Sequence, residues 1–176
     1  INLYYAENID GKGWSGVVSA PFNNNEYSTG HPALSQDGNT LYFVSDMPGG
    51  KGGSDIYMVA INSDGSLGTP ERLGDNINTE GKELFPYIDS NGTLYFSSNG
   101  HMGIGGLDVF YAEAQGDGFD VVNNLGKGVN SSADDFAYKY DPTSQSGYVS
   151  SNREGGMGSD DIYMVEAVEI PCEVTI

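Results

Sequence analysis

One aspartate recurs at the end of a glycine-rich segment in three places along the chain. Asp55, Asp108 and Asp161 are spaced by 53 residues, and Asn2 stands one such step before the first of them. A carboxylate in this place could ligate a cation, or it could accept N–H bonds from the loop before it. Asparagine accepts the same backbone bonds but would weaken a cation site. We therefore predict a structural role for Asp55, Asp108 and Asp161, with no metal and no cofactor.

Paired carboxylates are the second chemistry to consider, because glycoside hydrolysis uses two of them. Glu83, Asp134 and Asp135 are the nearest candidates, but they lie at equivalent loop ends of a repeat, where a structural role explains them. His31 and His101 lie at different places in that repeat, and the sequence has no G-x-S-x-G motif for a nucleophile. These patterns predict no catalytic residues, so an enzyme is not expected.

The elements that must position these residues form an internal repeat. Residues 45–57, 98–110 and 151–163 align without a gap, and a second motif relates residues 73–79 to 125–131. Each unit carries Asp-Gly or Asn-Gly turns between short runs of β-forming residues, which is the strongest short signal for hairpins. The glycines that precede each repeated Asp, as in residues 103–106, are expected to allow a tight turn and close backbone approach.

This repeat predicts an all-β fold. Four antiparallel strands every 50 or so residues match one blade of a β-propeller. We expect three four-stranded blades and part of another over residues 1–168, within a six-bladed ring, and the start of a linker or further domain at 169–176. The weaker fourth strand of each blade is expected around Trp14, Leu67 or Phe119. The missing blades lie either outside this chain or in a second copy of it, and we favour the first arrangement.

The other strands of the blades can be placed from the same period. They are expected near Leu3–Glu7, His31–Ser35, Thr40–Ser45, Ile56–Ile61, Leu84–Asp89, Thr93–Ser98, Val109–Ala114, Phe136–Asp141, Gly147–Ser151 and Ile162–Ala167.

Charge and composition exclude several classes of partner. The chain has 25 acidic and 7 basic side chains, for a formal net charge of −18. Nucleic acid and anionic membrane surfaces both require Lys and Arg, so neither is expected as a partner. Cys172 is the single cysteine, so no disulfide can form within the chain.

Two groups of residues resemble a known repeat. Residues 31–43 (HPALSQDGNTLYF) and Ser54–Tyr57 resemble the TolB-like, WD-type propeller repeat, and residues 103–108 and 76–79 are similar to OmpA-family envelope proteins of Bacteroidota. One branch of that family, PorE, belongs to the type IX secretion machinery. The resemblance implies a periplasmic, outer-membrane-associated protein of the cell envelope, which takes part in protein transport. It also implies protein partners, with peptidoglycan bound only through a domain outside this chain.

The function predicted from these observations is a non-enzymatic scaffold for protein binding. Loops on a regular frame are where recognition usually lies, and Lys51, Met102, Asn152 and Arg153 project from variable loop positions. Two alternatives stay open. One is a propeller that binds glycans or small ligands, which would need aromatic residues in loops that have almost none. The other is a propeller that serves as an accessory domain of a hydrolase.

Overall fold

The computed structural model describes residues 1–141 and 143–167, which contain strands, turns and loops only. No helix in this part of the chain could cross a membrane. The all-β prediction is confirmed, and Thr40–Ser45 is predicted to the residue. The linker expected at 169–176 lies outside the described residues.

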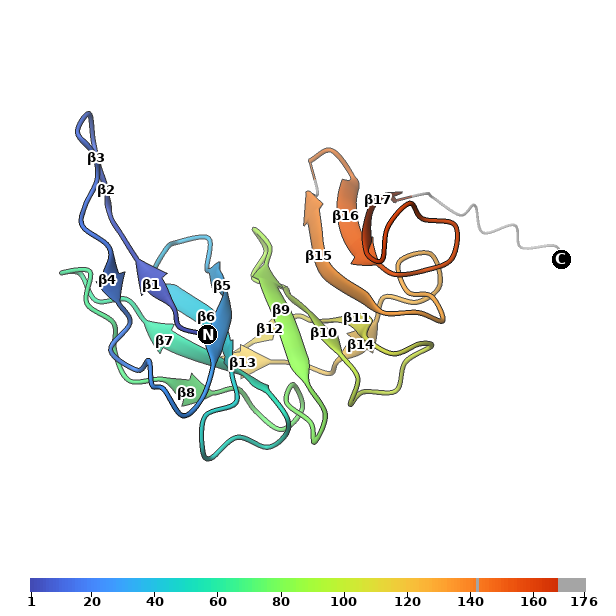
Figure 1. Ribbon diagram of the computed structural model, residues 1–176, viewed down its shortest axis with the longest axis horizontal. Coiled ribbons are helices and arrows are strands. Elements are labelled where there is room, and N and C mark those ends of the chain that lie inside the picture. The colour runs from blue at the N-terminus through green and yellow to red at the C-terminus, as the bar shows by residue number, and fades with distance from the viewer. Residues whose placement is uncertain (142, 168–176) are drawn as a thin grey trace, which may run out of the picture.

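Four groups of strands repeat along the chain, and we call them blades 1 to 4 after the predicted architecture (Figure 1). Blades 2 and 3 are four-stranded antiparallel sheets, blade 4 has three described strands, and blade 1 has two. Blade 1 is β1 (Tyr4–Tyr5) and β4 (Val18–Ser19); blade 2 is β5 (Thr29–Leu34), β6 (Thr40–Ser45), β7 (Asp55–Ala60) and β8 (Glu71–Arg72). Blade 3 is β9 (Glu83–Ile88), β10 (Leu94–Ser98), β11 (Asp108–Ala112) and β14 (Asn123–Asn124); blade 4 is β15 (Asp135–Asp141), β16 (Ser146–Ser151) and β17 (Asp161–Glu166).

The hydrophobic core lies between blades rather than within one of them. The cluster between blades 2 and 3 includes Val44 and Ile56 on one side and Phe96 and Phe110 on the other, all at most 6% exposed. A second cluster joins blade 1 to blade 2 through Leu3 and Phe43, and a third joins blade 3 to blade 4. Successive side chains along a strand point to opposite faces of the sheet, so a blade can pack on a neighbouring blade with each of its two faces. The described blades form an arc, and no closed ring is present in this part of the chain (Figure 1).

The predicted place of the fourth strand is wrong. Trp14 and Phe119 lie in two separate hairpins, β2 (Asn8–Ile9) with β3 (Gly13–Trp14) and β12 (Ala114–Gln115) with β13 (Gly118–Phe119). The fourth strands β4, β8 and β14 lie several residues later in the sequence than predicted, and each pairs with the third strand of its own blade. The physical reason is that the turn after each third strand closes a hairpin on itself before the chain returns to the sheet.

The first strands of blades 2, 3 and 4 share a β-bulge. Each bulge holds a residue other than glycine in the left-handed region, namely His31 (φ 48°), Phe85 (φ 51°) and Ala137 (φ 54°). The rings of His31 and Phe85 stack at a centroid distance of 4.1 Å, and Phe136 stacks on Phe85 at 5.2 Å. Burial lowers the pKa of His31, and its Nδ1 accepts a bond from the Phe85 N–H, so the ring is neutral. This row of rings joins the first strands of adjacent blades.

The left-handed backbone at Ala137 makes a simple prediction. Ala137→Gly should raise the free energy of unfolding by about 1 kcal/mol. The left-handed conformation is strained for a residue with a Cβ atom, and removal of the exposed methyl group of Ala137 loses little packing. Ala60→Gly, at an exposed strand position without a left-handed backbone, should instead lower it by about 0.5–1 kcal/mol. Urea unfolding of both variants measures the difference. A loss of stability in Ala137→Gly would contradict the bulge.

Candidate functional site

The repeated aspartates hold the loops that precede them. One oxygen of Asp108 (Oδ2) accepts bonds from the N–H groups of Ile104 and Gly105, both at 2.9 Å. Asp55 accepts from residues 51 and 52, and Asp161 from residues 157 and 158, with the same spacing. These contacts order a glycine-rich loop that has few side chains of its own.

These aspartates do not form an evident cation site. The other oxygen, Oδ1, is buried without a partner among the described residues in both Asp55 and Asp108. One free carboxylate oxygen per blade falls short of the about six to eight oxygens that Ca²⁺ takes. Within residues 1–141 and 143–167, no group of three or more His, Cys, Asp or Glu side chains is placed to hold a metal ion.

The hydrogen bonds of Asp108 can be tested by substitution. Asp108→Ala should lower the free energy of unfolding by roughly 1–2 kcal/mol, because two N–H groups of the loop lose their acceptor. Asp10→Ala, which removes an exposed turn carboxylate, is the control and should change little. A chelator that lowered the melting temperature as much as Asp108→Ala does would show instead that the aspartate binds a metal.

Asparagine and aspartate side chains also fix the segments that lead into and out of each blade. Asp46, Asn99 and Asn152 stand at one equivalent position, and each accepts a bond from the backbone N–H that leads into a first strand, at 2.6–2.8 Å. A second set was not predicted from the sequence. Asn78 and Asn130 are almost fully buried, and each bonds both the N–H and the C=O of one third-strand residue. The N-I-N and G-V-N triplets at matching repeat positions were the available signal.

The four residues predicted to bind a partner lie in the loops of three different blades. Met102 is 95% exposed, whereas Lys51 contacts Asp75 through its Nζ. Asn152 bonds Asp134 with its side chain. Arg153 turns inward, where it donates to the Val129 C=O and pairs with a fully buried carboxylate. The structure therefore brings no two of these side chains from different blades into contact, and Met102 is the most exposed of them.

The carboxylates that could have suggested hydrolysis are used inside the fold. Glu83 and Asp135 start the first strands of adjacent blades, and both are fully buried. Glu83 accepts bonds from the Thr79 N–H, from the Thr79 hydroxyl and from Ser98. Asp135 accepts from Ser131 and Arg153. Neither carboxylate has an open face toward solvent.

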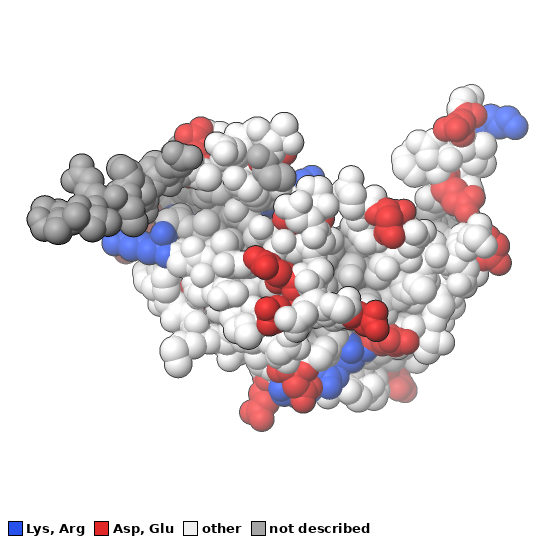
Figure 2. All heavy atoms as spheres, turned by 180° about the vertical axis from the view of Figure 1, so that it is seen from behind, with Lys and Arg blue, Asp and Glu red and all other residues white. Residues whose placement is uncertain are grey.

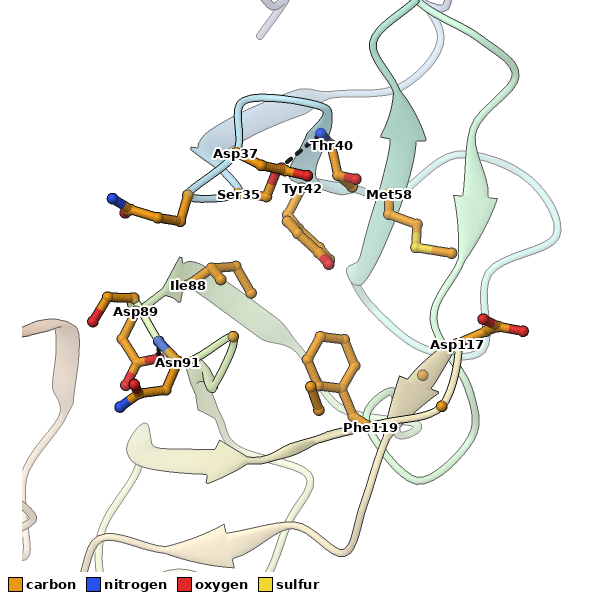
Figure 3. Close-up of a pocket in the computed structure, with 16 residues that line it drawn as sticks. Ser35, Asp37, Thr40, Tyr42, Met58, Ile88, Asp89, Asn91, Asp117 and Phe119 are labelled. Atoms are coloured by element: carbon orange, nitrogen blue, oxygen red, sulfur yellow. Dashed lines mark hydrogen bonds between the residues drawn. The ribbon is translucent and has the colours of Figure 1, made fainter.

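A cleft of about 560 Å³ lies between blades 2 and 3, and we call it the interblade cleft (Figure 3). Its apolar wall holds the rings of Tyr42 and Phe119, which meet edge to face at 6.2 Å. Polar groups come from two turns and the hairpin β12–β13; the lining includes Ser35, Gln36, Asp37, Asp89, Ser90, Asn91 and Asp117. None of the described residues that line the cleft is Lys, Arg or His.

The surroundings of Tyr42 and Asp37 determine the protonation states of these two side chains in the cleft. Burial and then the charge of Asp37 raise the pKa of Tyr42, so its hydroxyl is a neutral donor at physiological pH. The hydroxyl of Ser35 and the amide groups of Asn39 lower the pKa of Asp37, which stays ionised. Asp89 accepts the N–H groups of its own turn with Oδ1 only. The cleft therefore offers oxygen acceptors and one phenolic donor beside two aromatic rings.

Comparison with known proteins finds an enzyme of similar architecture. A scan against family models and a search of the curated proteins find no match. Among solved structures, the chain is similar to a thermostable family-43 glycoside hydrolase, a five-bladed propeller, with a TM-score of 0.51 and 17% identity. The match covers 92% of this chain and 65% of that one, so the chain spans somewhat less than two thirds of its length. This likeness shows a shared propeller-like fold.

The match corrects the prediction that the chain has no enzymatic role. That prediction rested on the propeller architecture and on the absence of a catalytic motif, and the same architecture here belongs to a glycoside hydrolase. Propeller frames host binding and catalysis alike, because function resides in the groups placed on the frame. The resemblance to envelope proteins is not touched by this match, so the periplasmic location and the envelope partners stay predictions.

Proposed function

We propose that this chain is a carbohydrate-binding propeller module of a protein that acts on glycans, and that the interblade cleft holds the glycan. The observation that carries the proposal is the lining of the cleft. Two aromatic rings lie beside a set of oxygen and amide groups in a concave site between blades. Ligand sites combine apolar walls with a few placed polar groups in this way.

The chemistry of the cleft favours a neutral polyhydroxylated ligand. The C–H face of a sugar ring packs on an aromatic face such as Tyr42 or Phe119, and the sugar hydroxyls donate to Asp89, Asn91 and Asp117. Phosphorylated or sulfated ligands are disfavoured, because the described lining has no basic residue and the chain has a net charge of −18. Among the charged groups on the face seen in Figure 2, acidic ones predominate.

The sequence could have pointed to this alternative only in part. A glycan-binding site was expected to need aromatic residues in the loops, whereas here the aromatic residues come from strand β6 and from strand β13 of the hairpin β12–β13. The two turns supply the polar half of the site, which the sequence does show as residues 35–39 and 89–92. The alternation of side chains along β6 places Tyr42 on the face toward blade 3.

A glycan array printed with neutral oligosaccharides, followed by calorimetric titration of the best binder, tests the proposal. Asp117→Ala and Tyr42→Ala should each weaken binding at least about tenfold, which corresponds to the loss of one good contact. Glu113→Ala is the matched control, because it removes an exposed carboxylate near the same hairpin that does not line the cleft. Release of reducing ends from the bound oligosaccharide, measured in parallel, shows whether the module also cleaves it.

Two results would contradict the proposal. One is the absence of binding to any neutral oligosaccharide on the array. The other is binding that Glu113→Ala weakens as much as Asp117→Ala does, since the ligand would then lie outside the cleft.

A further inference from the structure

One histidine joins the two blades that form the interblade cleft. The Nδ1 atom of His31 in β5 accepts a hydrogen bond of 3.2 Å from the backbone N–H of Phe85 in β9. The two rings also stack, with their centroids 4.1 Å apart and an angle of 11° between their planes. An Nδ1 atom that accepts an N–H carries no proton, so this hydrogen bond requires the neutral imidazole.

The repeat shows that this hydrogen bond belongs to one pair of blades. Phe85 and Ala137 occupy the place of His31 in blades 3 and 4, with the same left-handed backbone. Neither side chain contains a hydrogen-bond acceptor, so at the bulge blade 3 contacts blade 4 through the stack of Phe85 on Phe136. The interblade cleft lies between blades 2 and 3, which is the pair that the histidine joins.

The strands that carry this contact also carry the polar half of the cleft. Ser35 lies four residues after His31, directly after β5, and Asp89 lies four residues after Phe85, directly after β9. Four residues of strand span about 13 Å. The turns that begin at Ser35 and Asp89 both line the cleft. The spacing between these turns therefore depends on how closely β5 and β9 are held together at His31 and Phe85.

The surroundings of the imidazole favour its neutral form. Burial lowers the pKa of His31 from its ordinary value of 6.5. The charged and titratable side chains of the two pockets that His31 lines are Asp46 and Lys82 on one side, and Tyr87 and Lys139 on the other. Within residues 1–141 and 143–167, no carboxylate forms an ion pair with His31. A proton on Nδ1 would therefore remove the bond to blade 3 without gaining an ion pair in its place.

We propose that His31 makes the interblade cleft sensitive to pH, because protonation of its imidazole breaks the contact with Phe85 and loosens blade 2 from blade 3. This inference rests on the proposed glycan site and adds its regulation. A protonated Nδ1 is a donor that faces another donor, the Phe85 N–H, so the two atoms cannot stay at 3.2 Å. The left-handed backbone at both residues persists only where surrounding contacts impose it, so loss of the bond also releases the bulges.

The direction of the pH dependence follows from the lowered pKa. The unfolded chain, in which His31 has its ordinary pKa, binds the proton at a higher pH than the folded protein does. The contribution of His31 to the free energy of unfolding is therefore complete above about pH 6.5 and is lost as the pH falls below that value. Binding of a glycan in the cleft should weaken over the same range.

Histidine titration tests the contact without any ligand. The chain has two histidines, and NMR signals of their imidazole C–H groups can be assigned with His31→Asn and the control His101→Gln. The His31 signal should titrate below pH 6.5. The Oδ1 atom of asparagine can take the place of Nδ1 as an acceptor, asparagine tolerates a left-handed backbone, and its amide does not titrate. The urea midpoint should therefore fall between about pH 7.5 and 5.5 in the wild type and in His101→Gln, and less in His31→Asn.

Calorimetric titration with the best neutral oligosaccharide, at pH 7.5 and at pH 5.5, tests the effect on the cleft. The dissociation constant of the wild type should rise at least about threefold at the lower pH, because a smaller fraction of molecules keeps the arrangement that binds. His31→Asn should bind equally at both. Asp37 in the cleft has a lowered pKa and stays ionised over this range, so its charge does not cause the change.

The proposal is overturned if the wild type binds the oligosaccharide equally at both pH values. It is also overturned if the His31 signal titrates at or above pH 6.5, or if the urea midpoint of His31→Asn depends on pH as that of the wild type does. Absence of any binding at pH 7.5 would contradict the proposed function instead. The histidine titration and the urea midpoints would then still decide whether protonation breaks the contact between blades 2 and 3.

Discussion

Gly105→Ala is expected to lower the free energy of unfolding by about 3 kcal/mol, at the upper end of the cost of overpacking. A Cβ atom at Gly105 would lie 2.6 Å from the Ser131 carbonyl oxygen and 2.9 Å from the Ser132 carbonyl carbon, and it would be closer still to the Ala133 carbonyl oxygen. All three atoms are backbone of the loop that leads into blade 4. A side chain could rotate away, but this backbone moves only if the two blades separate.

The same repeat supplies a matched control in Gly158→Ala. Gly158 stands one repeat after Gly105, yet the nearest atom to its Cβ position is the Asp160 carbonyl oxygen at 3.6 Å. Neither glycine has a left-handed backbone, so alanine fits the local conformation of both. Gly158→Ala should therefore change stability by no more than about 0.5 kcal/mol. Urea unfolding compares the two, and equal effects would show that the loops of blades 3 and 4 are not in close contact.

The fold was predictable wherever local chemistry repeats. The turns and the alternation of apolar residues placed most strands within two residues, because these signals act over a few positions. The close approach of residues 103–106 to neighbouring backbone could be predicted from the glycines themselves. The fourth strands were misplaced because Trp14 and Phe119 were taken to anchor them, whereas both residues lie in hairpins outside the four-stranded sheets, and Phe119 packs across to blade 2. That choice depends on the neighbouring blade, which local sequence does not encode.

The interblade cleft was harder to predict for the same reason. Tyr42 and Phe119 are distant in the sequence, and each looks like an ordinary half-buried strand residue. They line one site only because blade 3 packs on blade 2. The direction of the Arg153 side chain was equally hidden, because a loop position that varies between repeats suggests an exposed group. Here the buried Asp135 determines its direction.

Arg153→Ala is the second substitution for which we expect a large effect, a loss of about 3 kcal/mol in the free energy of unfolding. Removing one partner of a buried ion pair leaves the other charge without compensation. Asp135 is fully buried and would keep only its bonds from Ser131. Arg153 also donates to the Val129 C=O at 2.6 Å and lies over the Tyr163 ring at 4.8 Å. The substitution therefore weakens contacts within and between blades 3 and 4.

Arg72→Ala provides the comparison, because Arg72 pairs with Asp75 at 2.8 Å while the Asp75 side chain is 69% exposed. An exposed pair contributes at most about 1 kcal/mol, so Arg72→Ala should be much milder. Adding Asp135→Asn to Arg153→Ala should recover part of the loss, since the uncompensated charge disappears. If Arg153→Ala costs no more than Arg72→Ala, the guanidinium faces solvent and is free for recognition, as its loop position suggested. If Arg153→Ala has the larger effect, Arg153 serves the fold through Asp135, and a charge reversal at Lys51 is the substitution that tests binding by these loops.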